Sequence, residues 1–257
     1  MSTEDQHDWS DWPSGVGRVI LETVDSTMAE ASRIAPEISG PTWVFAHRQT
    51  AGRGRRGRDW VDPQGNFAAT LVMRQIEPAA TLALRSFVAS LALYDTMVAT
   101  TGNSQSFSLK WPNDVLLNGG KLAGILLESV ATGDQNSHLA VGIGINLENV
   151  PKVGEIESGA VRPVSLVMET GLFITPLECL TLLGPAYAKW EHKFSTYGFA
   201  PIREAWLTRA ARLGQVITAR TGQQELTGTF DTIDDAGQLI LSTAKGRRAI
   251  PAADIYF

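Results

Sequence analysis

The sequence is poor in the residues that build disulfide frameworks and zinc sites. A single cysteine, Cys179, excludes an internal disulfide and is typical of a reducing compartment. Cys179 lies among leucines, which predicts a helix core position and argues against a nucleophilic thiolate, because a thiolate needs a polar, electropositive setting. The four histidines, His7, His47, His138 and His192, lie too far apart for a recognisable zinc motif.

Long apolar runs are also missing. No stretch approaches the ~20 apolar residues that a membrane span needs, so no membrane partner is expected. Residues 1–16 are acidic and lack the apolar segment of a secretory signal. We therefore expect a cytoplasmic protein whose residues 1–16 form a flexible acidic tail.

Positive charge is scarce overall but concentrated in one segment. The formal net charge of −5 argues against a general nucleic-acid binder, because phosphate contacts depend on a basic face. Residues 51–60, in contrast, contain four arginines and one aspartate. Concentrated positive charge inside an acidic protein predicts a small anionic ligand.

Hydrophobic periodicity predicts a mixed α+β fold in the first four fifths of the chain. Strands are expected at residues 19–21, 43–46, 67–73, 107–111, 115–117, 121–130 and 139–145. Residues 79–100 predict one long core helix. Thr27 and Glu30 have capping-box spacing for a helix that Pro36 must end.

The last part of the chain changes from helical to strand patterns. Thr175, Pro176 and Glu178 predict the start of a helix that runs to about Tyr197, and residues 201–212 predict another. Short strands then follow at residues 216–219, 226–233, 238–242 and 247–251, with a hairpin turn at residues 234–237. This predicts a main domain at residues 17–212 and a small β-barrel at residues 213–257.

Residues 52–60 read GRGRRGRDW and match the bare G-x-G-x-x-G pattern. A dinucleotide-binding turn normally has small or apolar residues at the variable positions and lies in a βαβ unit, whereas three arginines stand here. An RNA contact is a second alternative, which the overall acidity disfavours. We favour a loop that closes over an anionic ligand, because glycines allow close approach and guanidinium groups neutralise carboxylate and phosphate oxygens. Trp60 then stacks on a base or packs in the core.

Residues 110–114 read KWPND and are followed by Lys121 and Gly124. The plain interpretation is a hairpin tip, but such a turn also brings Lys110 and Asp114 near Lys121. Joining a carboxylate to an α-phosphate requires two anions to meet, and Mg²⁺ held through Asp114 with a fixed ammonium at Lys121 would relieve their repulsion. The segment therefore predicts a site that activates an acid with a nucleoside triphosphate.

Together these segments resemble the biotin protein ligases. The matching segments are Ser26-Thr27, residues 49–58, residues 110–114, residues 121–126 and residues 142–146, in the same order and spacing. The resemblance implies a mixed-sheet catalytic domain of the class II aminoacyl-tRNA synthetase and biotin ligase type, with a C-terminal SH3-like barrel. It also implies two steps. Biotin and MgATP give biotinyl-5′-AMP and pyrophosphate, and a lysine of a biotin carboxyl carrier domain then takes the biotin.

The resemblance also assigns roles to residues. It implies that Lys121 and Arg55 are catalytic and that Asp114 holds Mg²⁺, directly or through water. The implied biotin contacts are Ser26, Thr27, Gln49, Gly52, Arg53, Gly54, Arg55, Lys121, Gly124 and Gly142. The implied ATP contacts are Arg55, Arg56, Arg58, Trp60, Lys110, Asn113, Asp114, Lys121 and Asn146. For Asn146, a strand-end residue that satisfies a turn is the alternative.

Two departures and several alternatives accompany this interpretation. Met28 stands where the family often has asparagine. Separately, few residues precede the first strand, so we expect a ligase without a DNA-binding domain, with no DNA partner and no repressor function. A lipoate or octanoate ligase or transferase, and a non-catalytic biotin-binding sensor, are the rival functions. The expected protein partner is the carrier protein or domain of acetyl-CoA carboxylase or a related carboxylase. A monomer and a homodimer both stay open.

Overall fold

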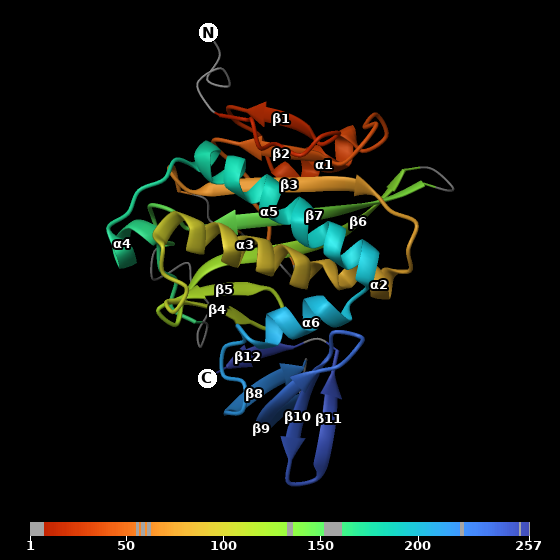
Figure 1. The fold of residues 1–257 in the computed structure, drawn as a ribbon, viewed down its shortest axis with the longest axis vertical. Helices are drawn as coiled ribbons and strands as arrows, with labels where there is room; N and C mark the ends of the chain where they lie inside the picture. The colour runs from red at the N-terminus through yellow and green to blue at the C-terminus, as the bar shows by residue number, and fades with distance from the viewer. Residues whose placement is uncertain are drawn as a thin grey trace.

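The structure, a computed structural model, describes residues 8–54, 57, 60, 63–132, 136–151, 161–221, 224–251 and 253–256. In this part of the chain, a larger and a smaller sheet are stacked end to end, with helices across the larger one (Figure 1). The strands of the larger sheet are β1 (Gly17–Leu21), β2 (Thr42–Ala46), β3 (Phe67–Arg74), β4 (Phe107–Lys110), β5 (Asp114–Leu117), β6 (Gly120–Thr132) and β7 (Asn136–Ile145). The helices are α1 (Thr27–Ile34), α2 (Ala79–Ala83), α3 (Arg85–Thr101), α4 (Leu166–Thr170), α5 (Pro176–Tyr197) and α6 (Ala200–Leu207).

The larger sheet has the order β1-β2-β3-β7-β6-β5-β4. Strands β1 and β2 are parallel and all its other neighbouring strands are antiparallel, so the predicted mixed sheet is confirmed. Because successive side chains of a strand point to opposite faces, each strand contributes to two different environments. On β3, for example, Ala69 and Leu71 pack in the main core, whereas Thr70 faces the other way.

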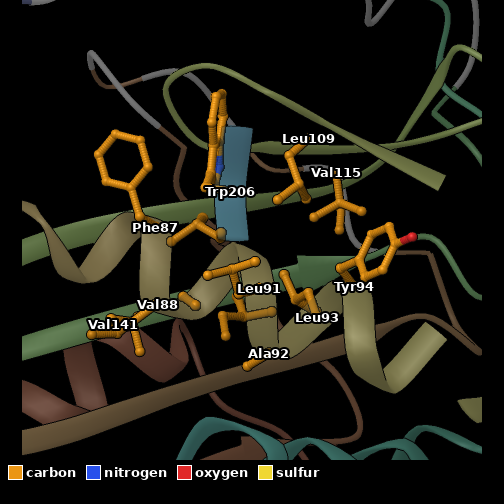
Figure 2. Packing of buried hydrophobic residues seen from close by; sticks show 14 of the residues in the cluster. Phe87, Val88, Leu91, Ala92, Leu93, Tyr94, Leu109, Val115, Val141 and Trp206 are labelled. Carbon is orange, nitrogen blue, oxygen red and sulfur yellow. The ribbon is translucent and has the colours of Figure 1, made fainter. Parts of the chain in front are cut away.

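Helices α3 and α5 cover the core face of this sheet (Figure 1). Figure 2 shows Phe87 and Leu91 of α3 packed close to Trp206 of α6 and Val115 of β5. The opposite face carries α1 and a smaller apolar cluster that includes Met28, Val44 and Val72. That second face is more polar, because glycine, threonine and charged residues occupy its central positions.

The predicted helix over residues 79–100 is two helices, because the chain turns at Leu84 between α2 and α3. The segment Ala79–Thr101 is apolar and long enough to cross a membrane, but 72% of its most apolar window is buried inside the fold, as expected for a core helix. The helix start predicted at Thr175 is confirmed, and reciprocal bonds between Thr175 and Glu178 form a capping box there. The one predicted at Thr27 is wrong: Ser26 is the N-cap residue of α1, and the Thr27 hydroxyl donates to Gln49 instead.

The described part of the predicted flexible tail is packed on the body of the protein. Trp9 and Trp12 meet edge to face, and the Arg18 guanidinium lies over both rings. The Trp12 indole donates to the Val16 carbonyl, and its ring fills the space left by Gly184 on α5. These contacts place Trp9 and Trp12 against the body of the protein, while residues 1–7 lie outside the described part and the flexibility of the tail stays a prediction.

The smaller sheet is antiparallel and has the order β11-β10-β9-β8-β12. Its strands are β8 (Val216–Thr221), β9 (Gln224–Ile233), β10 (Leu239–Thr243), β11 (Gly246–Ile250) and β12 (Asp254–Tyr256). The first four match the predicted strands, and β12 was not predicted. The turn between β9 and β10 docks on the main domain, where Gly237 accepts a 3.0 Å hydrogen bond from the Trp111 indole. A side chain at Gly237 would clash with Leu84 and Phe87, so this contact requires glycine.

Candidate active site

A cavity lies over the second face of the larger sheet, and the predicted site residues converge on it. Loops after β1 and β2 form one wall, strands β5 to β7 form the floor, and β12 of the smaller sheet lies along the rim. The residues expected from the sequence that line it are Ser26, Thr27, Gln49, Arg53, Gly54, Trp60, Lys110, Asn113, Asp114, Lys121, Gly124 and Gly142.

Strand register sets the floor of the cavity. Lys110 on β4 pairs with Asp114 on β5, which pairs with Gly124 on β6. Gly124 in turn pairs with Gly144 on β7. Because paired residues lie side by side on one face of a sheet, these four form a row with two charged groups at one end and two bare glycines beside them.

Lys121 reaches this face through an irregularity in β6. Lys121 and Gly124 are three positions apart, an odd offset, so regular alternation would send their side chains to opposite faces. The β5–β6 register shifts between Val115 and Leu116, and Leu122 and Ala123 both face the core. One extra residue of this kind is a β-bulge, which redirects the side chains that precede it. The bulge therefore turns Lys121 toward Asp114.

Asn146 supports the bulge from the end of β7. Its backbone N–H donates to the Leu122 carbonyl, and its side-chain amide donates to the Val164 carbonyl. Val164 in turn bonds the Lys121 carbonyl, so Lys121 is held from both sides. Asn146 is buried and does not line the cavity, but its Oδ1 has no hydrogen-bond partner in the described part of the chain. In this structure Asn146 therefore acts through Lys121, whose strand it holds, and not at the surface of the cavity.

Two lysines share one carboxylate at the charged end. The Lys121 Nζ lies 2.7 Å from Asp114 Oδ1, and the Lys110 Nζ lies 3.6 Å from Asp114 Oδ2. Burial lowers the pKa of Lys110; Asp114 and Asp254 partly offset this, and the Lys121 charge adds to it. Lys110 and Lys121 thus lie among the carboxylates of Asp114 and Asp254, and their ammonium groups are the ones that suit a phosphate or a carboxylate of a ligand.

The turn that carries these charges is fixed on three sides. The Trp111 indole bonds Gly237 of the smaller sheet, as described above. The Pro112 carbonyl accepts from Ser86 on α3, and the Asn113 amide donates to the Ile125 carbonyl on β6. A turn held in this way presents Lys110 and Asp114 with little freedom.

The other end of the cavity is lined by hydroxyl and amide groups. The Thr70 hydroxyl donates to the Thr27 hydroxyl at 2.9 Å, and that hydroxyl donates to the Gln49 carbonyl oxygen at 3.1 Å. The Thr27 backbone N–H donates to the same oxygen, and an N–H can only donate, so the orientation of the Gln49 amide is fixed. Its NH₂ group points away from Thr27 as a donor. This end is suited to a neutral head group that accepts and donates hydrogen bonds.

The two ends of the glycine-arginine segment, Gly52 and Trp60, are joined by one backbone hydrogen bond. The Trp60 N–H donates to the Gly52 carbonyl, and a side chain at Gly52 would collide with the Trp60 carbonyl and the Gln49 amide. The Trp60 ring lies on the bare floor at Gly124 and Gly144, so it packs against the sheet inside the cavity. Between these ends, Arg55, Arg56 and Arg58 lie outside the described residues.

Arg53 joins this segment to the sheet. Its guanidinium lies 3.7 Å from the Glu128 carboxylate on β6, and both side chains are partly exposed. By alternation, Glu128 is on the same face as Gly124 and Leu126, so the ion pair crosses the polar end of the cavity. Glu128 was not among the predicted site residues, although an acidic residue in an otherwise apolar strand is a signal that could have identified it.

Several lining residues were also missed by the sequence analysis. They are Thr70, Pro112, Ile125, Leu126, Ile143, Gly144, Val161, Ala253, Asp254, Ile255 and Tyr256, whereas Met28, which also lines the cavity, was noted only as a departure from the family. Thr70 offers a signal, since it is a polar residue in the middle of an apolar strand. The residues of β12 offer none, because only the docking of the smaller sheet brings them to the cavity.

The residues at the charged end do not form a resident metal site. No group of three or more His, Cys, Asp or Glu side chains suited to a metal occurs in the parts of the chain described above. Asp114 already faces two ammonium groups, and Mg²⁺ bound mainly by protein normally needs more oxygen ligands. Any magnesium at this site is therefore expected to arrive with the phosphates of a nucleotide.

Comparisons with known proteins agree with this geometry. Residues 16–146 match the model of the Biotin/lipoate A/B protein ligase family, and residues 213–257 match the Biotin protein ligase C terminal domain. The chain is 56% identical over 238 residues to the biotin–[acetyl-CoA-carboxylase] ligase of Paracoccus denitrificans, covering 93% of this chain and 99% of that protein. It is 33% identical to the bifunctional ligase/repressor BirA of Bacillus subtilis, covering 92% of this chain and 71% of that protein.

Solved structures show the same fold. The biotin protein ligase of Aquifex aeolicus in complex with biotin and ATP superposes with a TM-score of 0.76 at 27% identity, covering 93% of this chain and 97% of that one. The sequence match over nearly the whole length of the Paracoccus relative and the two family models lead to one assignment. The chain belongs to the biotin protein ligase family.

Proposed function

We propose that this chain activates biotin with MgATP and attaches it to a lysine of a biotin carboxyl carrier domain. The observation that carries this proposal is the two-ended cavity, with neutral hydrogen-bonding groups at Thr27, Thr70 and Gln49 and cationic groups at Lys110 and Lys121. Thr70 is in register with Gly142 on β7 and Leu126 on β6, and Lys121 lies further along β6, so the two ends are separated both across and along the sheet. Biotin, which joins a ureido ring to a carboxylate through a valeric acid chain, offers a matching group to each end.

In the first step, a biotin carboxylate oxygen attacks the α-phosphorus of ATP, the bond to the β-phosphate oxygen breaks, and pyrophosphate leaves. Lys121 is positioned to neutralise the carboxylate and the α-phosphate together, because a preorganised cation stabilises charge that develops in the transition state. Lys110 adds positive charge behind it. Asp114 holds both lysines and is our proposed contact for the magnesium that accompanies the phosphates, directly or through water.

At the head end, Ser26, Thr27, Gln49 and Arg53 are our proposed partners of the ureido ring. The fixed Gln49 amide offers a donor, and the hydroxyl chain through Thr27 and Thr70 offers both donor and acceptor positions. The glycine-arginine loop, with Arg55, Arg56 and Arg58, is proposed to cover the adenylate, and Asn113 to face the nucleotide. Covering a mixed anhydride protects it from water until an acceptor arrives.

In the second step, the ε-amine of the acceptor lysine attacks the carbonyl carbon of biotinyl-5′-AMP. The carbon–oxygen bond to AMP breaks, an amide forms, and the amine loses its proton. The Paracoccus relative is named for acetyl-CoA carboxylase, which supports the carrier protein of that enzyme or a related carboxylase as the acceptor. We also propose a cytoplasmic protein with a catalytic domain at residues 17–212 and a barrel at residues 213–257; the separate sheets support this division.

The polar head end distinguishes this function from lipoate or octanoate transfer, which the broader family description includes. Octanoate has an apolar tail, and lipoate ends in a disulfide ring without hydrogen-bonding amide groups. Neither acid brings a head group that can exchange hydrogen bonds with Thr27, Thr70 and Gln49. A ureido ring offers both donors and an acceptor to this end, so the site favours an acid with a ureido-like head.

Pyrophosphate release from purified protein with MgATP and biotin, lipoate or octanoate tests the proposal. We expect release with biotin alone, and label from biotin should then appear on the lysine of a purified carrier domain. A carrier with that lysine changed to arginine is the control and should stay unlabelled. Release only with lipoate or octanoate would assign the sister activity, and tight biotin binding without release would make the protein a sensor.

A further inference from the structure

The head end of the cavity has an apolar wall as well as a polar one. Met28 lies next to Thr27 at the start of α1, is 3% exposed and lines the cavity. Its Cε lies 2.7 Å from the position that a Cβ on Gly142 would occupy, and Thr70 Oγ1 lies 3.6 Å from the same point. The Met28 methyl group therefore covers the floor beside the Thr70 hydroxyl.

The surroundings of Met28 hold its side chain in this place. It belongs to the apolar cluster of Val44, Val72 and Ala140 on this face of the sheet, with Leu126 packed against the cluster. Gly142 provides the space for it, because any larger residue would meet the Met28 methyl group. Methionine is flexible by itself, so this packing is what gives the wall a defined shape.

Polar and apolar walls that meet at one point select a head group with two different edges. Thr27, Thr70 and Gln49 suit an edge that makes hydrogen bonds, whereas Met28 and Leu126 suit an edge of carbon and sulfur. A thioether of the protein gains dispersion energy against a polarisable ligand group at close contact. Resting on the proposed function, we propose that Met28 determines specificity for the sulfur-containing ring of the acid, while the hydroxyl chain reads its ureido ring.

Desthiobiotin is the probe for this assignment. It keeps the ureido ring and the acid chain of biotin but has no sulfur and no second ring. We expect the unaltered protein to favour biotin in kcat/KM for pyrophosphate release. Met28→Ala should lower kcat/KM for biotin by about tenfold, as expected for lost apolar contacts in a pocket, and leave desthiobiotin nearly unchanged. The preference between the two acids should shrink accordingly.

Two control variants distinguish the effect of the apolar wall at Met28 from that of the polar wall at Thr70. Met28→Leu keeps most of the volume and should retain most of the preference for biotin. Thr70→Val removes the hydroxyl but keeps the shape, so it should weaken both acids by the same factor because both carry the ureido ring. If Met28→Ala instead lowers both acids equally, Met28 only supports the fold and the proposal is wrong.

A crowding variant covers the case in which Met28→Ala does not fold. Gly142→Ala adds a methyl group where the Met28 methyl lies and should reduce biotin use more than desthiobiotin use, and Met28→Ala combined with Gly142→Ala should recover part of the loss. The same preferences should appear as dissociation constants measured by calorimetry without ATP. Binding preference that follows Met28 without pyrophosphate release would retain this proposal and overturn the catalytic one.

Discussion

The Lys121 ammonium lies 2.7 Å from the Asp114 carboxylate, although regular strand alternation would place Lys121 on the opposite face of the sheet from the Gly124 that pairs with Asp114. The bulge at Leu122 causes this approach, and Asn146 and Val164 hold the bulge. The position of Lys121, the main proposed catalytic cation, therefore depends on the backbone hydrogen bonds that Asn146 and Val164 make with Leu122 and Lys121. Such an arrangement keeps the ammonium aimed at the site before any ligand is bound.

Replacing Lys121 with alanine should remove most of the first step. The cation is expected to stabilise charge that forms in the transition state, so Lys121→Ala should lower the adenylation rate by about 10²–10³-fold. Biotin affinity should change little, because the head-group contacts are at the other end. Single-turnover pyrophosphate release and calorimetry measure the two quantities, and Lys245→Ala on an exposed turn is the control. An unchanged rate would remove Lys121 from the chemistry.

Breaking the contact between Arg53 and Glu128 should weaken the attachment of the glycine-arginine segment to β6. Glu128→Gln keeps the shape and removes the charge, so the Arg53 guanidinium loses its anchor on β6. Both side chains are partly exposed, where ion pairs contribute at most about 1 kcal/mol, so biotinyl-5′-AMP should escape about two- to fivefold faster.

The escape rate can be followed by dilution of labelled adenylate into unlabelled substrate. High salt should reduce the difference, because screening weakens the pair in the unaltered protein as well. Glu225→Gln, which breaks the exposed pair with Arg220 on the smaller sheet, is the matched control. Equal escape from both variants and the unaltered protein would show that Arg53 does not fasten the loop.

Trp111→Phe should weaken the docking of the smaller sheet. The substitution keeps an aromatic ring but leaves the buried Gly237 carbonyl without its donor, which costs about 1–3 kcal/mol. Because β12 lines the cavity, the KM for ATP should rise together with the loss of stability. Urea unfolding and ATP titration of the adenylation rate give the two values. A loss of stability with an unaltered KM would show that β12 takes no part in nucleotide binding.

The sequence indicated most of the site because its residues come in short, chemically distinct segments. The turn at residues 110–114 and Gly142 of β7 were expected at the site, and the structure brings them to one cavity. Thr27 was expected to cap a helix, but its hydroxyl meets Gln49 from a distant loop, a contact that local pattern does not reveal. The wrong capping prediction concerns a side chain that the structure places at the cavity.

Other features depend on contacts between distant segments. Met28 was noticed as a departure from the family, but its place over Gly142 depends on how α1 crosses the sheet. Trp9 and Trp12 belonged to a tail expected to be flexible, yet Arg18 and Gly184 provide a binding place for their rings. Neither contact leaves a periodic pattern in the nearby sequence, so only the folded structure reveals them.

The buried thiol of Cys179 provides a pH-dependent measure of stability. Burial raises the pKa of Cys179 from 9.0 to about 12, so the thiol stays protonated in the folded protein where it ionises in the unfolded one. A group whose pKa is raised by folding contributes stability that is complete below its unfolded pKa and is lost as the pH rises through its folded pKa. The free energy of unfolding should therefore fall between pH 9 and about 12, by up to about 1.4 kcal/mol per pH unit from this group.

Comparison with Cys179→Ala separates this contribution from those of lysines and tyrosines that titrate in the same range. The free energy of unfolding of the unaltered protein minus that of Cys179→Ala should be constant at pH 7 to 8. This difference should fall as the pH rises to 10 and higher. In the same samples, a thiol reagent at pH 8 should label Cys179 only as fast as the protein unfolds. Rapid labelling of the folded protein would mean that the thiol is accessible, in contradiction to its complete burial.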